Sequence, residues 1–260
     1  MLLLITNIKN LNKVVIILLL LPFLLQCQKD KDEKVSYLTK WEDASNQHRI
    51  SYERNTEGKL IKASSYHNGR IYHYDQYIYN IHELQKIESY DVRYYGDTTS
   101  NELTALHSLS RKGNNLEYIN YYLHKPYTLP SSKGVYIMGE NGEYKREDFY
   151  LYDTSKASWR YTLYSNFEYY GDTTLLIKQY NANNSLIGTT TLTFDKMKNP
   201  MENFDFLALN QGWNNFFPLR FKHNLIRLQA VNTDRQSNYT YNSDGYPLTL
   251  GTSIFYYEKK

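Results

Sequence analysis

The hexapeptide Tyr-Tyr-Gly-Asp-Thr-Thr occurs twice in this chain of 260 residues, at Tyr94–Thr99 and again at Tyr169–Thr174. Each copy places two strand-forming tyrosines before Gly-Asp and two threonines after it. Glycine accepts the positive φ of a tight turn, so each copy predicts a strand, a turn and a returning strand. A phosphate-binding loop would need several glycines ahead of a helix, and neither is present. A catalytic site is seldom duplicated within one domain, so the repeat indicates a structural unit that the chain uses again.

The same alternation of strand and turn signals continues along the chain from Val35 onward. Asn68-Gly69 and Asp244-Gly245 each separate two runs rich in tyrosine and β-branched residues, which is the strongest short-range signal for a hairpin. Helix signals are few. The best stretch is Asn199–Leu209, with a proline in the first turn, and a weaker one is Asn101–Leu109. The pattern predicts an all-β fold made of antiparallel hairpins.

The composition is dominated by tyrosine, with 28 Tyr against 10 Phe and 3 Trp. A tyrosine ring buries apolar area while its hydroxyl reaches water or a polar partner, which suits a thin sheet that is wetted on at least one side. The net charge is +3, with acidic and basic residues interspersed. A nucleic-acid partner would require a basic stripe, so we expect none.

The N-terminal segment Met1–Gln26 contains two lysines and then a run from Val14 to Leu25 that has no polar residue and includes Pro22. This run is shorter than the roughly 20 residues of a membrane-spanning helix and matches the hydrophobic region of a secretory signal. Cys27, the single cysteine of the chain, follows at once, and a charged stretch comes after it. We therefore expect a signal peptide over 1–26, a tether over 27–34 and a tyrosine-rich β domain over 35–260. An incidental cysteine in a signal that is cleaved elsewhere is the alternative.

Leu24-Leu25-Gln26-Cys27 resembles the lipobox of bacterial lipoproteins, in which the cysteine is lipidated and becomes the mature N-terminus. Gln26 departs from the usual Gly, Ala or Ser. The charged run from Lys29 to Glu33 resembles the signal that exports Bacteroidetes lipoproteins to the outer face of the outer membrane. The resemblance implies lipidation of Cys27 and a cell-surface location, anchored in the outer membrane.

Two further segments carry a family resemblance. Tyr239–Leu250 resembles the unit of tyrosine-aspartate repeats that builds Rhs-type β-sheet shells. Ser51–Lys62 is a looser version, with Arg54 where the repeat would have Asp or Asn. Phe194–Met201 resembles an Asp, Lys-Asn-Pro element of uncharacterised Bacteroidetes lipoproteins. The resemblance implies a single large twisted antiparallel sheet or half-barrel of repeated hairpins, with at most one or two short helices. It implies no activity.

No catalytic or metal-binding motif is present in the sequence. The seven histidines show no metal-ligand spacing, and no G-x-S-x-G element is found. An approach of His67 to His73 across the Asn68-Gly69 hairpin would have Asp75 as its only nearby acidic partner, so we expect both to be surface or half-buried histidines of the hairpin. Glu147 and Asp148 are adjacent on a strand and point to opposite faces, so they would not share a site. We therefore expect no enzyme activity, no metal and no cofactor.

Aromatic residues are the remaining candidates for binding. Exposed Trp or Tyr rings can stack on sugars or anchor a protein partner. The loop residues Trp213, Phe216 and Phe217, together with Trp159 and Tyr161 on a predicted strand, are the candidate binding residues. For the loop we favour the other interpretation, in which Trp213, Phe216 and Phe217 plug one open end of the sheet.

These observations lead to two hypotheses about function. The first is a lipid-anchored, non-catalytic envelope lipoprotein that binds a glycan or a protein through aromatic residues. The second is a structural or scaffolding lipoprotein of the envelope without a small ligand. The expected partners are thus the membrane, through the N-terminal lipid, and a glycan or an envelope protein.

Overall fold

The computed structural model describes residues 36–81, 83–124, 127–140, 143–200 and 221–259. The chain divides into two compact units, Met1–Ser36 with Lys259–Lys260, and Tyr37–Glu258. The features discussed below belong to the second unit. The predicted signal peptide over 1–26, the tether over 27–34 and Cys27 lie outside the described residues.

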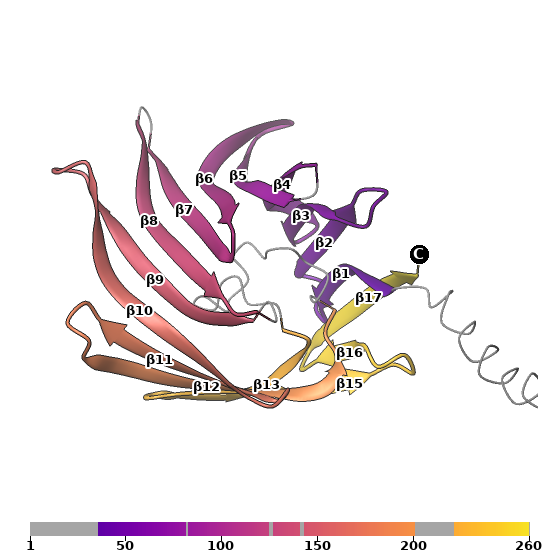
Figure 1. The fold of residues 1–260 in the computed structure, drawn as a ribbon. Helices are drawn as coiled ribbons and strands as arrows, with labels where there is room; N and C mark the ends of the chain where they lie inside the picture. Colours follow the sequence, from indigo (N-terminus) through magenta and orange to yellow (C-terminus); the bar gives the residue numbers. More distant parts are fainter. Residues whose placement is uncertain (1–35, 82, 125–126, 141–142, 201–220, 260) are drawn as a thin grey trace, which may run out of the picture. The chain divides into compact units, whose positions relative to one another are not determined.

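The described part of the chain consists of β-strands and turns (Figure 1). The strands are β1 (Ser36–Asp43), β2 (His48–Arg54), β3 (Leu60–His67), β4 (Arg70–Asn80), β5 (Glu83–Tyr95), β6 (Thr98–Lys112), β7 (Asn115–His124), β8 (Tyr127–Met138), β9 (Tyr144–Asp153), β10 (Ser158–Tyr170), β11 (Thr174–Asn181), β12 (Leu186–Lys198), β13 (His223–Ala230), β14 (Thr233–Gln236), β15 (Tyr239–Tyr241), β16 (Pro247–Leu250) and β17 (Ser253–Lys259).

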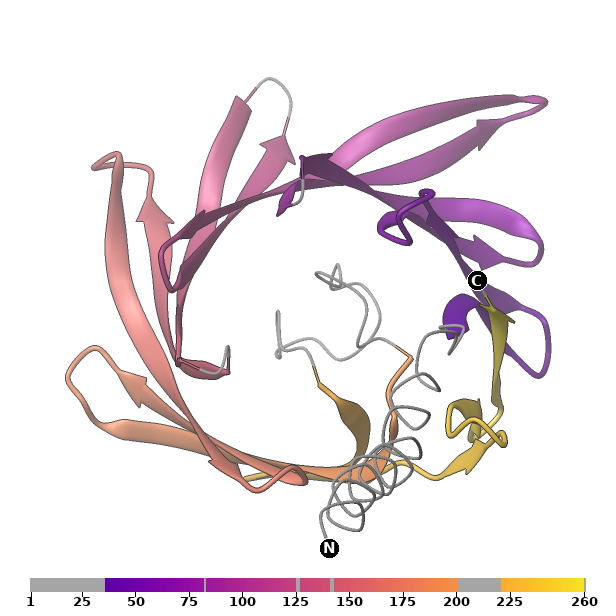
Figure 2. The same ribbon diagram turned by 45° about the vertical axis from the view of Figure 1, so that its right-hand side comes forward.

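All 17 strands belong to a single antiparallel sheet in which sequence neighbours are spatial neighbours, as the gradual change of colour in Figure 2 shows. Antiparallel registers connect β1 through to β14 and β15 through to β17, and β1 also pairs with β17. No ladder register joins β14 to β15 among the described residues, and the sheet is not closed. The predicted fold class, a single large antiparallel sheet of repeated hairpins, is therefore confirmed.

The two copies of the hexapeptide form hairpin turns of different length. In the first copy Tyr95 pairs with Thr98, which leaves a two-residue loop with Gly96 at a φ of 62°. In the second copy Tyr170 pairs with Thr174, which leaves a three-residue loop. The third loop residue, Thr173, corresponds to Thr98, which begins the return strand in the first copy. The same six residues thus give the same strand–turn–strand unit with a different register.

A second loop type recurs three times and is built around an asparagine. Asn55, Asn181 and Asn242 each accept, through Oδ1, the backbone N–H groups of the second and fourth residues that follow, at 2.9 to 3.1 Å. The third following residue has positive φ, and it is Gly58, Asn184 or Gly245. Asn55, and not Arg54 as the resemblance suggested, therefore occupies the Asp/Asn position of the loop that follows β2.

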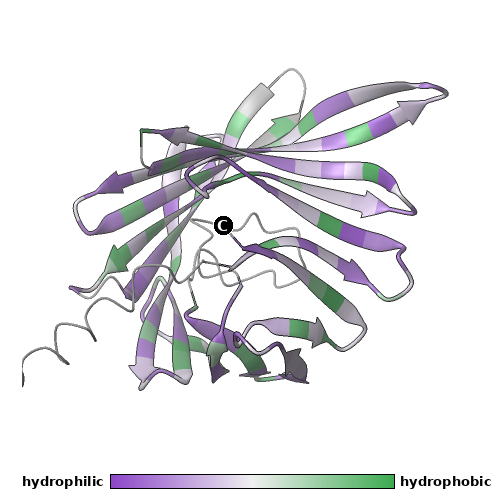
Figure 3. Ribbon diagram, turned by 90° about the vertical axis from the view of Figure 1, so that its right-hand side faces the viewer, coloured by the Kyte–Doolittle hydropathy of each residue, from purple (hydrophilic) through white to green (hydrophobic). Residues whose placement is uncertain are grey.

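Buried side chains gather on one face of the sheet, and Figure 3 shows hydrophobic and hydrophilic residues interspersed along the strands. Successive residues of a strand point to opposite faces, so every second residue of each strand supplies the core. The most buried large side chains include Leu38, Leu60, Ile87, Tyr136, Leu175 and Leu192. We refer to this face as the buried face of the sheet.

The weaker helix prediction, Asn101–Leu109, is wrong. This segment lies within β6, which pairs along its length with β5 and β7. Long-range pairing on both sides overrides the local preference of its Leu and Ala residues for helix. The other candidate, Asn199–Leu209, lies outside the described residues from position 201 onward. Within the described ranges, no helical segment has the length and apolarity of a membrane-spanning helix.

Candidate ligand-binding site

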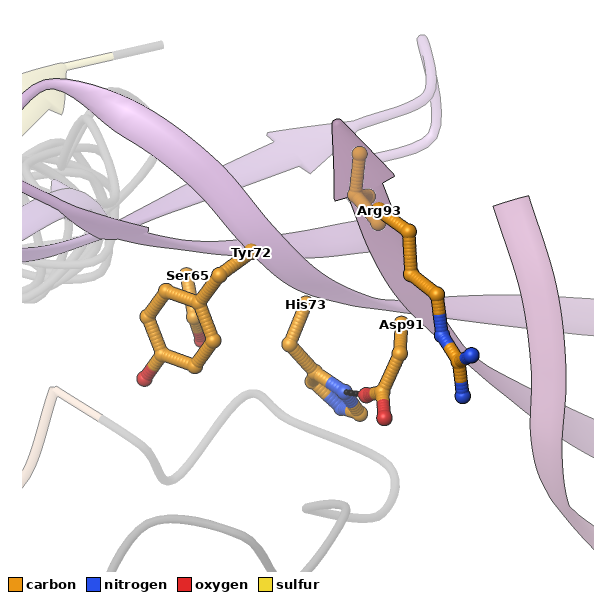
Figure 4. Close-up of a pocket in the computed structure, with 6 residues that line it drawn as sticks. Ser65, Tyr72, His73, Asp91 and Arg93 are labelled. Atoms are coloured by element: carbon orange, nitrogen blue, oxygen red, sulfur yellow. Dashed lines mark hydrogen bonds and ion pairs between the residues drawn. The ribbon is translucent and has the colours of Figure 1, made fainter. Parts of the chain in front are cut away.

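A β-bulge in strand β4 brings two consecutive side chains to the same side of the sheet. Ser65 of β3 pairs with His73, whereas the next residue, Tyr66, pairs with Ile71, so Tyr72 has no partner of its own. Such an extra residue bends the strand and redirects a side chain. Tyr72 and His73 consequently lie beside each other, as Figure 4 shows.

His73 is held between two carboxylates on the buried face. Its Nδ1 lies 2.8 Å from Oδ1 of Asp91 on β5, and its Nε2 lies 3.2 Å from Oδ1 of Asp75 on its own strand. Ser89 donates a hydrogen bond of 2.6 Å to the same oxygen of Asp75. These contacts follow from the register, because His73 is opposite Asp91 and Asp75 is opposite Ser89. His73, Asp75, Ser89 and Asp91 form what we call the histidine clamp.

The electrostatics of the clamp favour a charged imidazole. Burial alone would lower the pKa of His73, but the hydrogen bonds and charges of Asp75 and Asp91 outweigh it and raise that pKa. Both ring nitrogens are engaged by carboxylates, so His73 has no free nitrogen with which to accept a proton from a substrate. The hydroxyl of Ser89 donates to Asp75 instead of to the imidazole. The arrangement therefore differs from a serine–histidine nucleophile pair.

Two residues of the clamp, His73 and Asp91, line a cavity of about 470 Å³ together with Ser65, Tyr72, Val92 and Arg93 (Figure 4). Tyr72 is 48% exposed, so its ring is available to a ligand. Arg93 forms an ion pair of 2.6 Å with Glu102 of β6, and Figure 4 shows its side chain next to Asp91. The cavity thus offers one aromatic ring, a hydroxyl, a carboxylate and a guanidinium, supplied by three adjacent strands.

A second buried polar cluster surrounds Glu147 on β9. The hydroxyl of Tyr118 donates to Oε1 of Glu147 at 3.1 Å, and Tyr118 stacks on Tyr136, which is 1% exposed. Burial raises the pKa of Glu147 to about 7, against the opposing hydrogen bonds of the two tyrosines. Asp148 lies on the opposite face, where it accepts from Arg146. Glu147 and Asp148 therefore do not share a site, as predicted.

The ring of Tyr118 lies directly over Gly134 of β8. A Cβ atom at Gly134 would be 2.1 Å from Cε1 of Tyr118, so only glycine fits beneath the ring. This pair explains the glycine in the middle of a long strand, where glycine otherwise weakens a sheet.

The predicted aromatic binding residues are placed away from the cavity. Trp159 packs edge-on against Tyr152 at 5.1 Å, and Tyr161 packs edge-on against Tyr150 at 5.3 Å. Lys133 lies over the ring of Trp159, and Arg146 donates to the hydroxyl of Tyr161. Both residues are half-buried on the face opposite the core. Trp213, Phe216 and Phe217 lie outside the described residues.

The cavity residues were not singled out as a site from the sequence. His67 is an exposed hairpin residue, as expected, and it pairs with Arg70 and lies beside His48. The expectation that His73 is at most half-buried is wrong, because its side chain is enclosed by Asp75 and Asp91. A usable signal was the polar residue at every second position, His73-x-Asp75 and Ser89-x-Asp91, in strands otherwise rich in apolar residues. In the described part of the chain, no group of three or more His, Cys, Asp or Glu side chains is arranged to hold a metal ion.

Comparisons with known proteins give only remote structural likenesses. No family model matches the chain, and no curated protein matches it. A protein of unknown function from Bacteroides fragilis shares 17% identity over 45% of this chain and 91% of its own, with a TM-score of 0.37. A porin-like protein from Bacteroides uniformis shares 12% sequence identity over 86% of this chain and 96% of its own, with a TM-score of 0.38. A DUF3836 family protein from Parabacteroides distasonis shares 10% sequence identity over 49% of this chain and 88% of its own, with a TM-score of 0.27. At these values the likenesses carry no argument about function.

Proposed function

We propose that this protein is a non-catalytic binding module of the bacterial cell envelope, anchored through lipid on Cys27, and that it binds a carbohydrate in the β3–β5 cavity. The observation that carries the proposal is the convergence of the exposed Tyr72 ring with Ser65, Asp91 and Arg93 around one cavity. A few precisely placed polar groups in a concave site fix the orientation of a ligand.

The chemistry of the lining suits a sugar better than an apolar ligand. A sugar ring presents a C–H face that packs on an aromatic ring and a rim of hydroxyls that donate and accept hydrogen bonds. Tyr72 supplies the ring, Asp91 accepts and Arg93 donates. Because Asp91 and Arg93 are already held by His73 and Glu102, they are positioned before the ligand arrives.

We propose a non-catalytic role because the imidazole of His73 is held on both sides by carboxylates. A general base needs a free lone pair within reach of the substrate, and both nitrogens of His73 are committed to carboxylates. The clamp therefore serves to hold Asp91 in place, as a positioning group behind the cavity.

Binding of soluble oligosaccharides tests this assignment. A glycan array followed by calorimetry should identify a ligand whose affinity falls at least about tenfold in Tyr72→Ala and in Asp91→Asn. Tyr95→Ala is the matched control, because Tyr95 is 61% exposed at the tip of the β5–β6 hairpin and does not line the cavity. Equal losses in Tyr95→Ala and Tyr72→Ala would reject the cavity as the site.

A scaffolding role is the second candidate, and the hairpin tips favour it. Tyr95 is 61% exposed and its counterpart Tyr170 is 56% exposed, so both copies of the hexapeptide present a tyrosine to a partner. Crosslinking in intact cells distinguishes the two functions. Loss of envelope crosslinks in Tyr95→Ser with Tyr170→Ser, with no glycan ligand found, would favour the scaffold.

The anchoring part of the proposal has its own test. Protease shaving of intact cells should remove the wild-type protein, and Cys27→Ala should release it in soluble form. Digestion only after the outer membrane is opened would place the domain in the periplasm and would remove the case for an external glycan. An unprocessed wild-type chain would show that Gln26 prevents lipidation.

A further inference from the structure

Two exposed histidines face each other at the end of the sheet where β2 begins and β3 ends. His48 and His67 are directly opposite in the antiparallel register, with ring centroids 4.6 Å apart. Their Nδ1 atoms are 3.4 Å apart. Both side chains are exposed, so an ion can reach the space between these nitrogens from solvent. Neither histidine lines the cavity described above.

From this geometry we propose that His48 and His67 form a surface binding site for Zn²⁺, with both imidazoles as ligands through Nδ1. Zinc binds histidine nitrogen at about 2.0–2.1 Å in tetrahedral geometry, which separates two ligand nitrogens by about 3.4 Å. The separation of the two Nδ1 atoms in the structure equals that value. Ligands at right angles, as in square-planar Cu²⁺ or Ni²⁺ sites, would need nitrogens only about 2.9 Å apart. The pair therefore suits zinc without movement of the strands.

The protein supplies two ligands, and water completes the coordination. No third His, Cys, Asp or Glu joins the pair among the described residues. A site with two protein ligands and open positions exchanges its ion readily and can accept a further ligand from a partner. The β2–β3 pairing fixes the backbone positions of the two histidines, because the ladder continues through Arg49, Ile50 and their partners.

Asn68 contacts the outer nitrogen of His67. Its amide nitrogen Nδ2 lies 3.1 Å from Nε2 of His67. When Nδ1 binds the ion, Nε2 carries the proton, so the amide of Asn68 has to turn its oxygen toward Nε2 to accept that hydrogen bond. Two neutral imidazoles then bind zinc without net proton release, whereas imidazolium must lose its proton first.

Titration calorimetry of the full chain with ZnCl₂ at pH 7.5 tests the proposal. All variants carry Cys27→Ser, which removes the only thiol of the chain. We expect one equivalent of zinc to bind, with affinity reduced at least about tenfold in His48→Gln and in His67→Gln. His107→Gln is the matched control, because Nδ1 of His107 is already hydrogen-bonded to Asn120 at 2.6 Å.

Two results would overturn the proposal. One is the absence of a zinc-binding isotherm at millimolar ZnCl₂. The other is unchanged affinity in the double variant His48→Gln/His67→Gln, which would show that other groups hold the ion. Both histidines are exposed, so the variants should fold, and circular dichroism of each variant checks this. Glycan binding in the cavity is measured separately and is expected to be the same with and without zinc.

Discussion

The buried carboxyl of Glu147 makes a quantitative prediction about pH and stability. Its pKa is raised from 4.5 to about 7 in the folded chain, chiefly by burial. A group whose folded pKa is raised contributes stability below its unfolded pKa and loses it as the pH rises through the folded value. The difference between these two values corresponds to about 3 kcal/mol. The folded state should therefore lose up to about 3 kcal/mol between pH 4.5 and pH 8.5 because Glu147 ionises.

Glu147→Gln removes this loss while keeping an oxygen that accepts from Tyr118. At pH 4.5, where the wild-type carboxyl is protonated, the two proteins should have nearly equal free energies of unfolding. At pH 8.5 the variant should be more stable by about 3 kcal/mol. Urea unfolding followed by tryptophan fluorescence at several pH values measures both limits.

Asp148→Asn serves as the control for this experiment. Asp148 is on the opposite face and pairs with Arg146, and its charge is the smallest of the causes that raise the pKa of Glu147, so its removal should leave most of the loss between pH 4.5 and 8.5. Parallel pH profiles of wild type and Glu147→Gln over this range would refute the reasoning. They would mean that the carboxyl is solvated in the folded protein or that it relaxes away from the tyrosines when it ionises.

Three further outcomes follow from the contacts described above. Gly134→Ala should reduce the free energy of unfolding by about 3 kcal/mol, because the new Cβ would lie 2.1 Å from the Tyr118 ring; a double-mutant cycle with Tyr118→Ala should recover most of the additional loss. His73→Gln should destabilise the protein most below pH 6.5, and the deficit should shrink as the pH rises through the raised pKa of His73; a deficit independent of pH would contradict a charged clamp. Asn242→Ala should lower the unfolding free energy by about 1 kcal/mol, because the two backbone N–H groups held by its Oδ1 lose their partner; an unchanged thermal midpoint would argue against this loop role.

Local chemistry accounts for what was predictable from sequence. Asn68 and Gly69 both have positive φ, at 49° and 78°, and these two residue types adopt such angles readily. The hairpin between β3 and β4 therefore follows from two adjacent residues and the alternating runs beside them. The same holds for the tyrosine-rich strands, whose period-2 pattern predicts an antiparallel sheet with one buried face.

Register is what local chemistry left open. The two hexapeptide copies are identical, yet one closes a two-residue loop and the other a three-residue loop, because the neighbouring strand differs. The helix predicted over 101–109 failed for the same reason, since β5 and β7 pair with that segment on both sides.

The amino-acid sequence by itself determined the all-β class, the positions of the tight turns and the absence of familiar catalytic motifs, because each depends on residues within a few positions of one another. Only the tertiary structure decided that Asp91 meets His73 across 18 positions and that Tyr118 reaches Glu147 across 29. These contacts require the pairing of whole strands, β4 with β5 for the first and β7, β8 and β9 for the second. A shift of one residue in any of these registers would send the side chains to the other face, so the site is a property of the assembled sheet.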